Sequence, residues 1–184
     1  MDTQAIIDCT RRWIAAMVIE LDLCPFARRV FQGDKIRYHV SKAENEETLL
    51  DDLTAELITL TKTPLALIET TLLIHPRALA DFLDYNDFLD DAEQKVKGLG
   101  LRGVVQIASF HPDYQFAGTA PGAVENYTNR SPYPMLHLLR EESVTAVAGD
   151  PDELRDIPRR NIETLKELGI EKILEKLRKV ANDV

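Results

Sequence analysis

Hydrophobic positions recur at two different spacings along the chain, and these spacings predict helices and strands. Residues 3–22 repeat apolar side chains at helical spacing, and residues 45–62 do so through a series of leucines. Further helical tracts are expected from about residue 79 to 96 and on both sides of Gly169, near the end of the sequence. Each tract carries an apolar stripe, which predicts a helix that packs against a core by one face.

Shorter segments have the patterns of strands. "KIRYHV" alternates apolar and polar positions, and "LALIETTLLIHP" and "GVVQIASFHP" are apolar runs typical of buried strands. "VTAVAG", residues 144–149, is a fourth candidate. Because strands alternate with helices, we expect one domain over residues 1–184, an α/β sandwich whose central sheet of about four strands is largely parallel and flanked by helices. A ferredoxin-like α+β fold is the main alternative.

The composition limits the classes of protein to consider. The chain has 184 residues, of which 45% are hydrophobic, and its formal net charge is −9. An acidic chain whose basic clusters are only pairs of arginines is not expected to bind nucleic acid. No stretch approaches the ~20 apolar residues of a membrane span, and no secretion signal is recognisable, so we expect a cytoplasmic protein without membrane contact. Two cysteines are too few for a disulfide framework.

Two histidines follow predicted strands. His75 and His111 each precede a proline at the end of an apolar run. If the two strands run in the same direction, both side chains emerge at one edge of the sheet, where open α/β folds bind ligands. A proline that simply ends the strand is the alternative interpretation, and we prefer it for His75.

The segment 111–130 is long for a connection in a compact domain, and it is rich in aromatic residues. The Ser131-Pro132 pair that follows is typical of a helix start, so we expect a helix over residues 131–141. An arginine and amide side chains at a helix amino terminus favour a carboxylate or phosphate. This predicts an anion site formed by Asn126, Asn129, Arg130, Ser131 and Tyr133. In the alternative interpretation, Arg130 pairs with an acidic residue and the asparagines close turns.

On the expected helix, His137 and Glu141 would be neighbours four residues apart, opposite the leucines. This spacing lets the carboxylate orient the imidazole, or lets both side chains bind one metal ion with His111. Mixed ligands of this kind suit zinc or another first-row divalent metal. A solvated pair on an exposed helix face would have the same pattern. Glu142 falls among the leucines, which the pattern does not explain.

The two cysteines differ in their expected roles. Cys24 comes directly before Pro25, where it would cap a short helix in "CPFARRVF", and the helix dipole would favour its thiolate. If Cys24 instead ends the first helix, the thiol is inert. Cys9 lies on the apolar side of the first helix and is expected in the core.

Three segments carry a resemblance to a known family: "LDLCPFA", "FHPDYQF" and "NYTNRSPYPMLHLLREES". They resemble the hallmark segments of a bacterial protein family, the domain of unknown function 1415, and the resemblance covers nearly the whole chain. It implies a bacterial, soluble protein of one domain. It supplies no catalytic assignment, because the family has no established reaction.

We therefore consider two classes of function. The first is an enzyme that acts on a small anionic metabolite in a cleft between the 111–130 loop and the 131–141 helix, by acid-base or metal-assisted chemistry. His111 or His137 would be the general acid or base, Asp113 or Glu141 the orienting carboxylate, and Cys24 a further nucleophile. The second is a sensor of a small ligand or metal, or a partner-binding domain. The sequence leaves the reaction, the substrate, any metal and the oligomeric state open.

Overall fold

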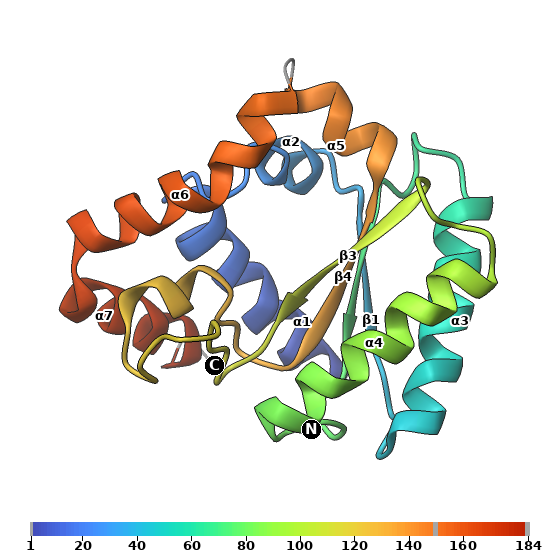
Figure 1. Cartoon of the computed structure of the whole chain (residues 1–184), viewed down its shortest axis with the longest axis horizontal. Helices are drawn as coiled ribbons and strands as arrows, with labels where there is room; N and C mark the ends of the chain where they lie inside the picture. Colours follow the sequence, from blue (N-terminus) through green and yellow to red (C-terminus); the bar gives the residue numbers. More distant parts are fainter. Residues whose placement is uncertain (1, 149–150, 183–184) are drawn as a thin grey trace.

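The computed structural model describes residues 2–148 and 151–182 and places a four-stranded sheet between two layers of helices (Figure 1). The strands lie in the order β1-β2-β4-β3, and their bounds are β1 Ile36–Val40, β2 Thr70–Ile74, β3 Val105–Phe110 and β4 Met135–Arg140. The sheet is therefore covered on both faces, which explains why β2 and most of β4 are buried.

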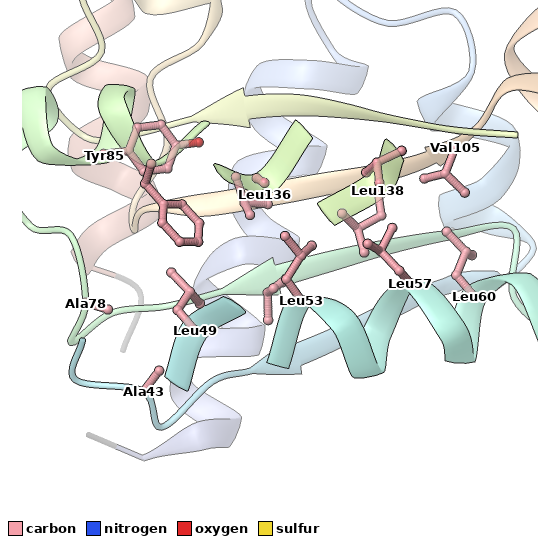
Figure 2. Packing of buried hydrophobic residues seen from close by; sticks show 14 residues of the cluster. Ala43, Leu49, Leu53, Leu57, Leu60, Ala78, Tyr85, Val105, Leu136 and Leu138 are labelled. Atoms are coloured by element: carbon pink, nitrogen blue, oxygen red, sulfur yellow. The ribbon is translucent and has the colours of Figure 1, made fainter. Parts of the chain in front are cut away.

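One face of the sheet packs against α3 (Glu46–Lys62) and α4 (Phe82–Gly98). Asn45 and Asp81 cap these helices by accepting hydrogen bonds from backbone amides of the first turn. The leucines of α3 point to the sheet, where Leu136 and Leu138 of β4 meet them (Figure 2). Each fully buried leucine contributes roughly 1.5–3 kcal/mol, so this interface is a main source of stability.

The other face is covered by segments from both ends of the chain (Figure 1). The amino-terminal segments are α1 (Thr3–Trp13), the π-helix η1 (Ile14–Ile19) and α2 (Ala27–Gln32). The carboxyl-terminal ones are α6 (Pro151–Leu168) and α7 (Ile170–Asn182), with α5 (Glu141–Ala148) and the 3₁₀-helix η2 (Val124–Thr128) beside them. Trp13, Leu165 and Ile173 are buried in the shared core, so the two ends of the chain pack together.

Most of the predicted elements are confirmed. The periodic tracts at 45–62 and 79–96 form α3 and α4, and the terminal tract divides at Gly169, whose φ of 82° suits glycine. The strands predicted from "KIRYHV", "LALIETTLLIHP" and "GVVQIASFHP" match β1, β2 and β3. The mixed α/β class with helices on both faces is therefore correct.

The prediction of a largely parallel sheet is wrong. β1 pairs with β2 in parallel, but β4 lies between β2 and β3 and is antiparallel to both. The ferredoxin-like alternative does not fit either, because the strands and their intervening helices follow the order βαβαββ. β1, β2 and β3 nevertheless point in the same direction, as the alternation with helices indicated.

The segment from 131 to 148 has the opposite secondary structure to that predicted. The expected helix over 131–141 is strand β4, and the expected strand "VTAVAG" lies in α5 as far as residue 148; Gly149 is outside the described residues. "MLHLLR" has apolar residues on both faces of the strand because both faces of the sheet are covered, and such a run cannot be told from a buried helix by periodicity. Glu141 and Glu142 suit the first turn of α5, where acidic side chains meet the positive end of the helix dipole.

Among the described residues, no helix is both long and apolar enough to cross a bilayer.

Candidate functional site

A cavity of about 450 Å³ lies over the second face of the sheet. Its floor is formed by β3 and β4, and its walls come from the η1–α2 region, the end of η2, α5 and α6. We call it the His137 cavity. Its polar lining side chains are Cys24, Gln106, Thr128, Asn129, His137 and Asn161.

The remaining lining of the His137 cavity is apolar and includes Phe26, Phe110 and Leu139. A narrow recess of about 60 Å³ shares these two phenylalanines and His137 and continues toward Thr70 and Trp13. Among the described residues, no lysine, arginine, aspartate or glutamate lines the cavity or its recess. The site is therefore an uncharged space with a few polar groups.

His137 reaches this cavity because β4 is a strand. Its neighbours in the sheet are Leu72 of β2 and Ala108 of β3. Side chains alternate between the two faces of a strand, so His137 shares its face with Met135 and Leu139 and is turned away from the leucines that meet α3.

The hydrogen bonds of Thr70 define the tautomer of His137. The Thr70 hydroxyl donates its one proton to the Leu138 carbonyl at 2.7 Å, so it accepts from His137 Nε2, which is also 2.7 Å away. Nε2 therefore carries the proton of the neutral ring. Burial lowers the pKa of His137 to about 4, so the imidazole is neutral at pH 7.

Nδ1 is the remaining polar atom of the His137 ring. It has no hydrogen-bond partner among the described residues, and it remains accessible to solvent. In the neutral tautomer Nδ1 has a lone pair and no proton, so it is a hydrogen-bond acceptor.

Cys24 lines the same cavity, but its thiol is not activated. The backbone amides of Phe26 and Ala27 lower its pKa, as expected at a helix start, but burial outweighs them and raises the pKa above its ordinary value. Burial of the Cys24 thiol therefore works against the thiolate that a helix cap would favour. No hydrogen bond joins Cys24 and His137, both of which lie in the described part of the chain.

Two amide side chains complete the polar lining. Asn129 donates to the Ser109 carbonyl and accepts from the Thr128 hydroxyl, and Asn161 of α6 donates to the Leu23 carbonyl. These bonds hold the walls to the floor and to the η1–α2 region. Asn129 was predicted from the sequence, whereas Asn161 was missed because nothing in the pattern of α6 distinguishes it from an ordinary solvent-facing residue.

The other residues of the expected anion site do not enter the His137 cavity. Asn126 is fully buried, and its amide bonds the backbone of Phe116, Ala120 and Pro121, so it holds the loop together. The guanidinium of Arg130 donates to the carbonyls of Tyr114 and Pro121 and lies 4.4 Å from the Tyr127 ring centre.

Ser131 donates to the Tyr133 carbonyl and caps no helix, because the helix expected to begin there is absent. Ser131, Tyr133 and Arg130 line a separate groove of about 380 Å³ against α7. Cys9 is in the core as expected, and it also borders this groove. The pKa of the Tyr133 hydroxyl is raised, mainly by burial.

His111 and His75 leave the sheet at the same edge, as the direction of β2 and β3 requires. Both are fully buried beside Tyr85, with ring centres 5.1 and 5.7 Å from it. His111 Nε2 lies 3.2 Å from the Leu79 carbonyl, and Nδ1 accepts from the Asp113 amide. This edge is a packed aromatic cluster, and Asp113 contributes its backbone while its side chain is exposed.

The expected metal site lacks its geometric basis. His137 is in a strand and Glu141 begins α5, so the two are not separated by one helical turn. Over the described residues, no group of three or more histidine, cysteine, aspartate or glutamate side chains could hold a metal ion. Glu142, unexplained by the sequence pattern, is exposed and lies 3.8 Å from the Arg140 guanidinium.

Comparison with known proteins identifies the family. The chain matches the family described as "Protein of unknown function (DUF1415)" over residues 5–175, and it belongs to this family. Neither a comparison with curated proteins nor one with solved structures finds a significant match.

Proposed function

We propose that this member of the DUF1415 family binds a small, uncharged and largely apolar molecule in the His137 cavity. One observation carries the proposal. An apolar space of about 450 Å³ holds an imidazole whose Nδ1 has no partner among the described residues. Ligand pockets are typically of this size and combine apolar walls with a few polar groups.

The chemistry of the lining favours an uncharged ligand over the anion expected from the sequence. Arg130, the expected anion-binding residue, is bonded to loop carbonyls outside the cavity. His137 is neutral at pH 7 because burial lowers its pKa to about 4. An anion would lose its hydration without gaining a countercharge, which is costly in an apolar space.

Indole is a suitable probe because it is small, aromatic and uncharged. Its binding is measured by isothermal titration and by chemical-shift changes of the His137 ring. Ala108 is the neighbour of His137 on β3 and lines the cavity, so Ala108→Leu fills the space next to the imidazole. Ala55→Leu on the exposed face of α3 is the matched control.

Wild type and Ala55→Leu are expected to bind indole saturably with one site, whereas Ala108→Leu loses this binding while keeping its fold. Binding that is unchanged in Ala108→Leu contradicts the location. If indole and a panel of other neutral aromatic compounds all fail to bind wild type, the proposed function is wrong.

The enzyme considered from the sequence is a second candidate, because Cys24 and His137 line one cavity. The unprotonated Nδ1 of His137 would accept one proton, either from a bound substrate or from the Cys24 thiol; in the second case substrate binding would have to bring the thiol within reach of Nδ1, and the thiolate would be the nucleophile. This candidate requires turnover that is lost in both His137→Gln and Cys24→Ser. Saturable binding without turnover in a broad substrate screen would support the binding function alone.

A further inference from the structure

The proposed function leaves open which groups a ligand of the His137 cavity carries. We infer that this ligand presents one hydrogen-bond donor, an N–H or O–H, to His137 Nδ1 and rests its apolar body against Phe26 and Phe110. This inference rests on the proposed function and adds the polarity and the orientation of the bound molecule.

The hydrogen bonds at the floor of the cavity have a fixed direction. Thr70 has one hydroxyl proton, and the Leu138 carbonyl receives it at 2.7 Å. The same oxygen must then accept from His137 Nε2. β2 thus holds the imidazole in the tautomer in which Nδ1 only accepts, so a ligand carbonyl or ether oxygen has no donor on this ring.

The neighbours of Nδ1 in the structure leave it unpaired. Ala108 and Leu72, which flank His137 in the sheet, have no polar side-chain atoms. The amides of Asn129 and Asn161 each donate one N–H to a backbone carbonyl at the walls, which fixes their orientation. A ligand that displaces water from Nδ1 without a donor leaves a buried acceptor unpaired, and this penalty selects for ligands with a donor.

Two phenylalanines shape the apolar contact. Phe110 lines both the cavity and its recess, and its ring centre lies 6.3 Å from that of His137 at an interplanar angle of 46°. Phe26 lines the same two spaces. Aromatic rings pack favourably on such walls, so the class of ligand is an aromatic or similarly apolar molecule with a single N–H or O–H group.

Indole and benzofuran test the inference, because they have nearly the same shape and only indole has a ring N–H. Loss of one buried hydrogen bond corresponds to about tenfold in affinity, so indole is expected to bind wild type about ten times more tightly than benzofuran. In His137→Leu the side chain has a similar size but no hydrogen-bond acceptor. The preference for indole is expected to disappear there, while benzofuran still binds.

Equal affinity for the two probes in wild type, or tighter binding of benzofuran, would overturn the inference and leave the proposed function standing. Failure of both probes and of the wider panel would overturn the proposed function itself. Long-range ¹H–¹⁵N correlation on the protein without ligand is an independent measurement. It is expected to show the proton on Nε2 of His137, and a proton on Nδ1 would overturn the inference whatever the probes do.

Discussion

The buried histidine at the end of β2 should make this protein sensitive to acid, and His75→Asn tests the effect. His75 is fully buried, its Nδ1 lies 3.0 Å from the Ala78 carbonyl, and its Nε2 has no partner in the described residues. Burial lowers the pKa of His75 to about 4 from the ordinary value of 6.5. Asparagine places an amide donor near the position of Nδ1, so it keeps the bond to Ala78 and removes the titrating ring.

The magnitude follows from linkage between protonation and folding. As the pH falls below 6.5 the unfolded chain binds a proton at His75 before the folded chain does, so stability decreases until the pH reaches the folded pKa of about 4. For a shift of this size, the loss is about 2 kcal/mol at about pH 5 and about 3 kcal/mol at about pH 4. The loss is a large fraction of the stability of an ordinary domain.

Urea unfolding measures the effect, with fluorescence of Trp13, the one tryptophan of the chain, as the signal. His75→Asn is expected to be less stable than wild type near neutral pH, because it loses the ring packed on Tyr85. Between about pH 7.5 and about pH 5, however, it should lose about 2 kcal/mol less than wild type does. Parallel losses in the two proteins would refute the argument that burial holds His75 neutral.

His39 is a matched control with the opposite sign. Its Nδ1 lies 3.0 Å from the buried Glu56 carboxylate, whose hydrogen bond raises the pKa of His39 above 6.5. Protonated His39 therefore stabilises the folded state below pH 6.5, and this contribution is lost as the pH rises through the folded pKa. His39→Asn should consequently lose more stability than wild type on acidification, which separates a specific effect of His75 from a general effect of removing a histidine.

Three further outcomes follow from buried polar groups. Cys24 should react with iodoacetamide more slowly than a free thiol near neutral pH, because burial raises its pKa; mass spectrometry measures the rate, and faster reaction would contradict this. Arg140→Met should lower the free energy of unfolding by about 3 kcal/mol, since the guanidinium donates to the carbonyls of Leu60, Thr63 and Ile68 at the α3–β2 connection. The exposed Arg102→Met is its control and should change little. Asn126→Ala should cost about 3 kcal/mol in the same urea assay and increase proteolysis of the 111–128 loop; unchanged stability would show that the loop does not depend on this amide.

Long amphipathic segments were predictable because one physical requirement shapes all of their positions. In α3 the leucines at 49, 53, 57 and 60 are all fully buried, whereas the polar positions between them are exposed or half-buried, apart from Glu56. A stripe of this length has no alternative strand interpretation, since strands alternate every second residue. The caps Asn45 and Asp81 likewise follow from local chemistry, since both accept bonds from backbone amides within three residues of themselves.

The segment from 131 to 148 could not be predicted in this way, because its structure depends on partners that are distant in the sequence. Leucine and methionine favour helices, but β4 is stabilised by pairing with β2 and β3, and this outweighs local propensity. In the opposite sense, the β-branched Val144 and Thr145 lie in a helix that begins directly after β4. Only knowledge of the strand pairing would have corrected both assignments.

Some of the residues predicted for the site do lie together, but the secondary structure that brings them together differs from the one expected. Cys24, Asn129 and His137 do line one cavity, whereas His111 and Arg130 are bonded elsewhere. These residues were predicted because they are polar groups in unusual sequence surroundings. This criterion does not depend on whether the segment is a helix or a strand. It could not indicate Thr70, because a threonine in a buried strand is ordinary and its role depends on a histidine 67 positions away.

The position of His137 in a strand, and not in the helix expected from the sequence, also affects how well its ring could recognise a ligand. On an exposed helix face the imidazole would be mobile and hydrated, and a ligand would have to order it on binding. In the centre of the sheet it is held between Leu72 and Ala108, and Thr70 fixes its proton. The orientation of the acceptor is therefore set by folding, so a ligand at this site would cost little conformational entropy of the ring. A single uncharged nitrogen can be selective under these conditions. If a ligand leaves Nδ1 unpaired, the ring cannot turn to find another partner, so the cost of the unpaired acceptor remains.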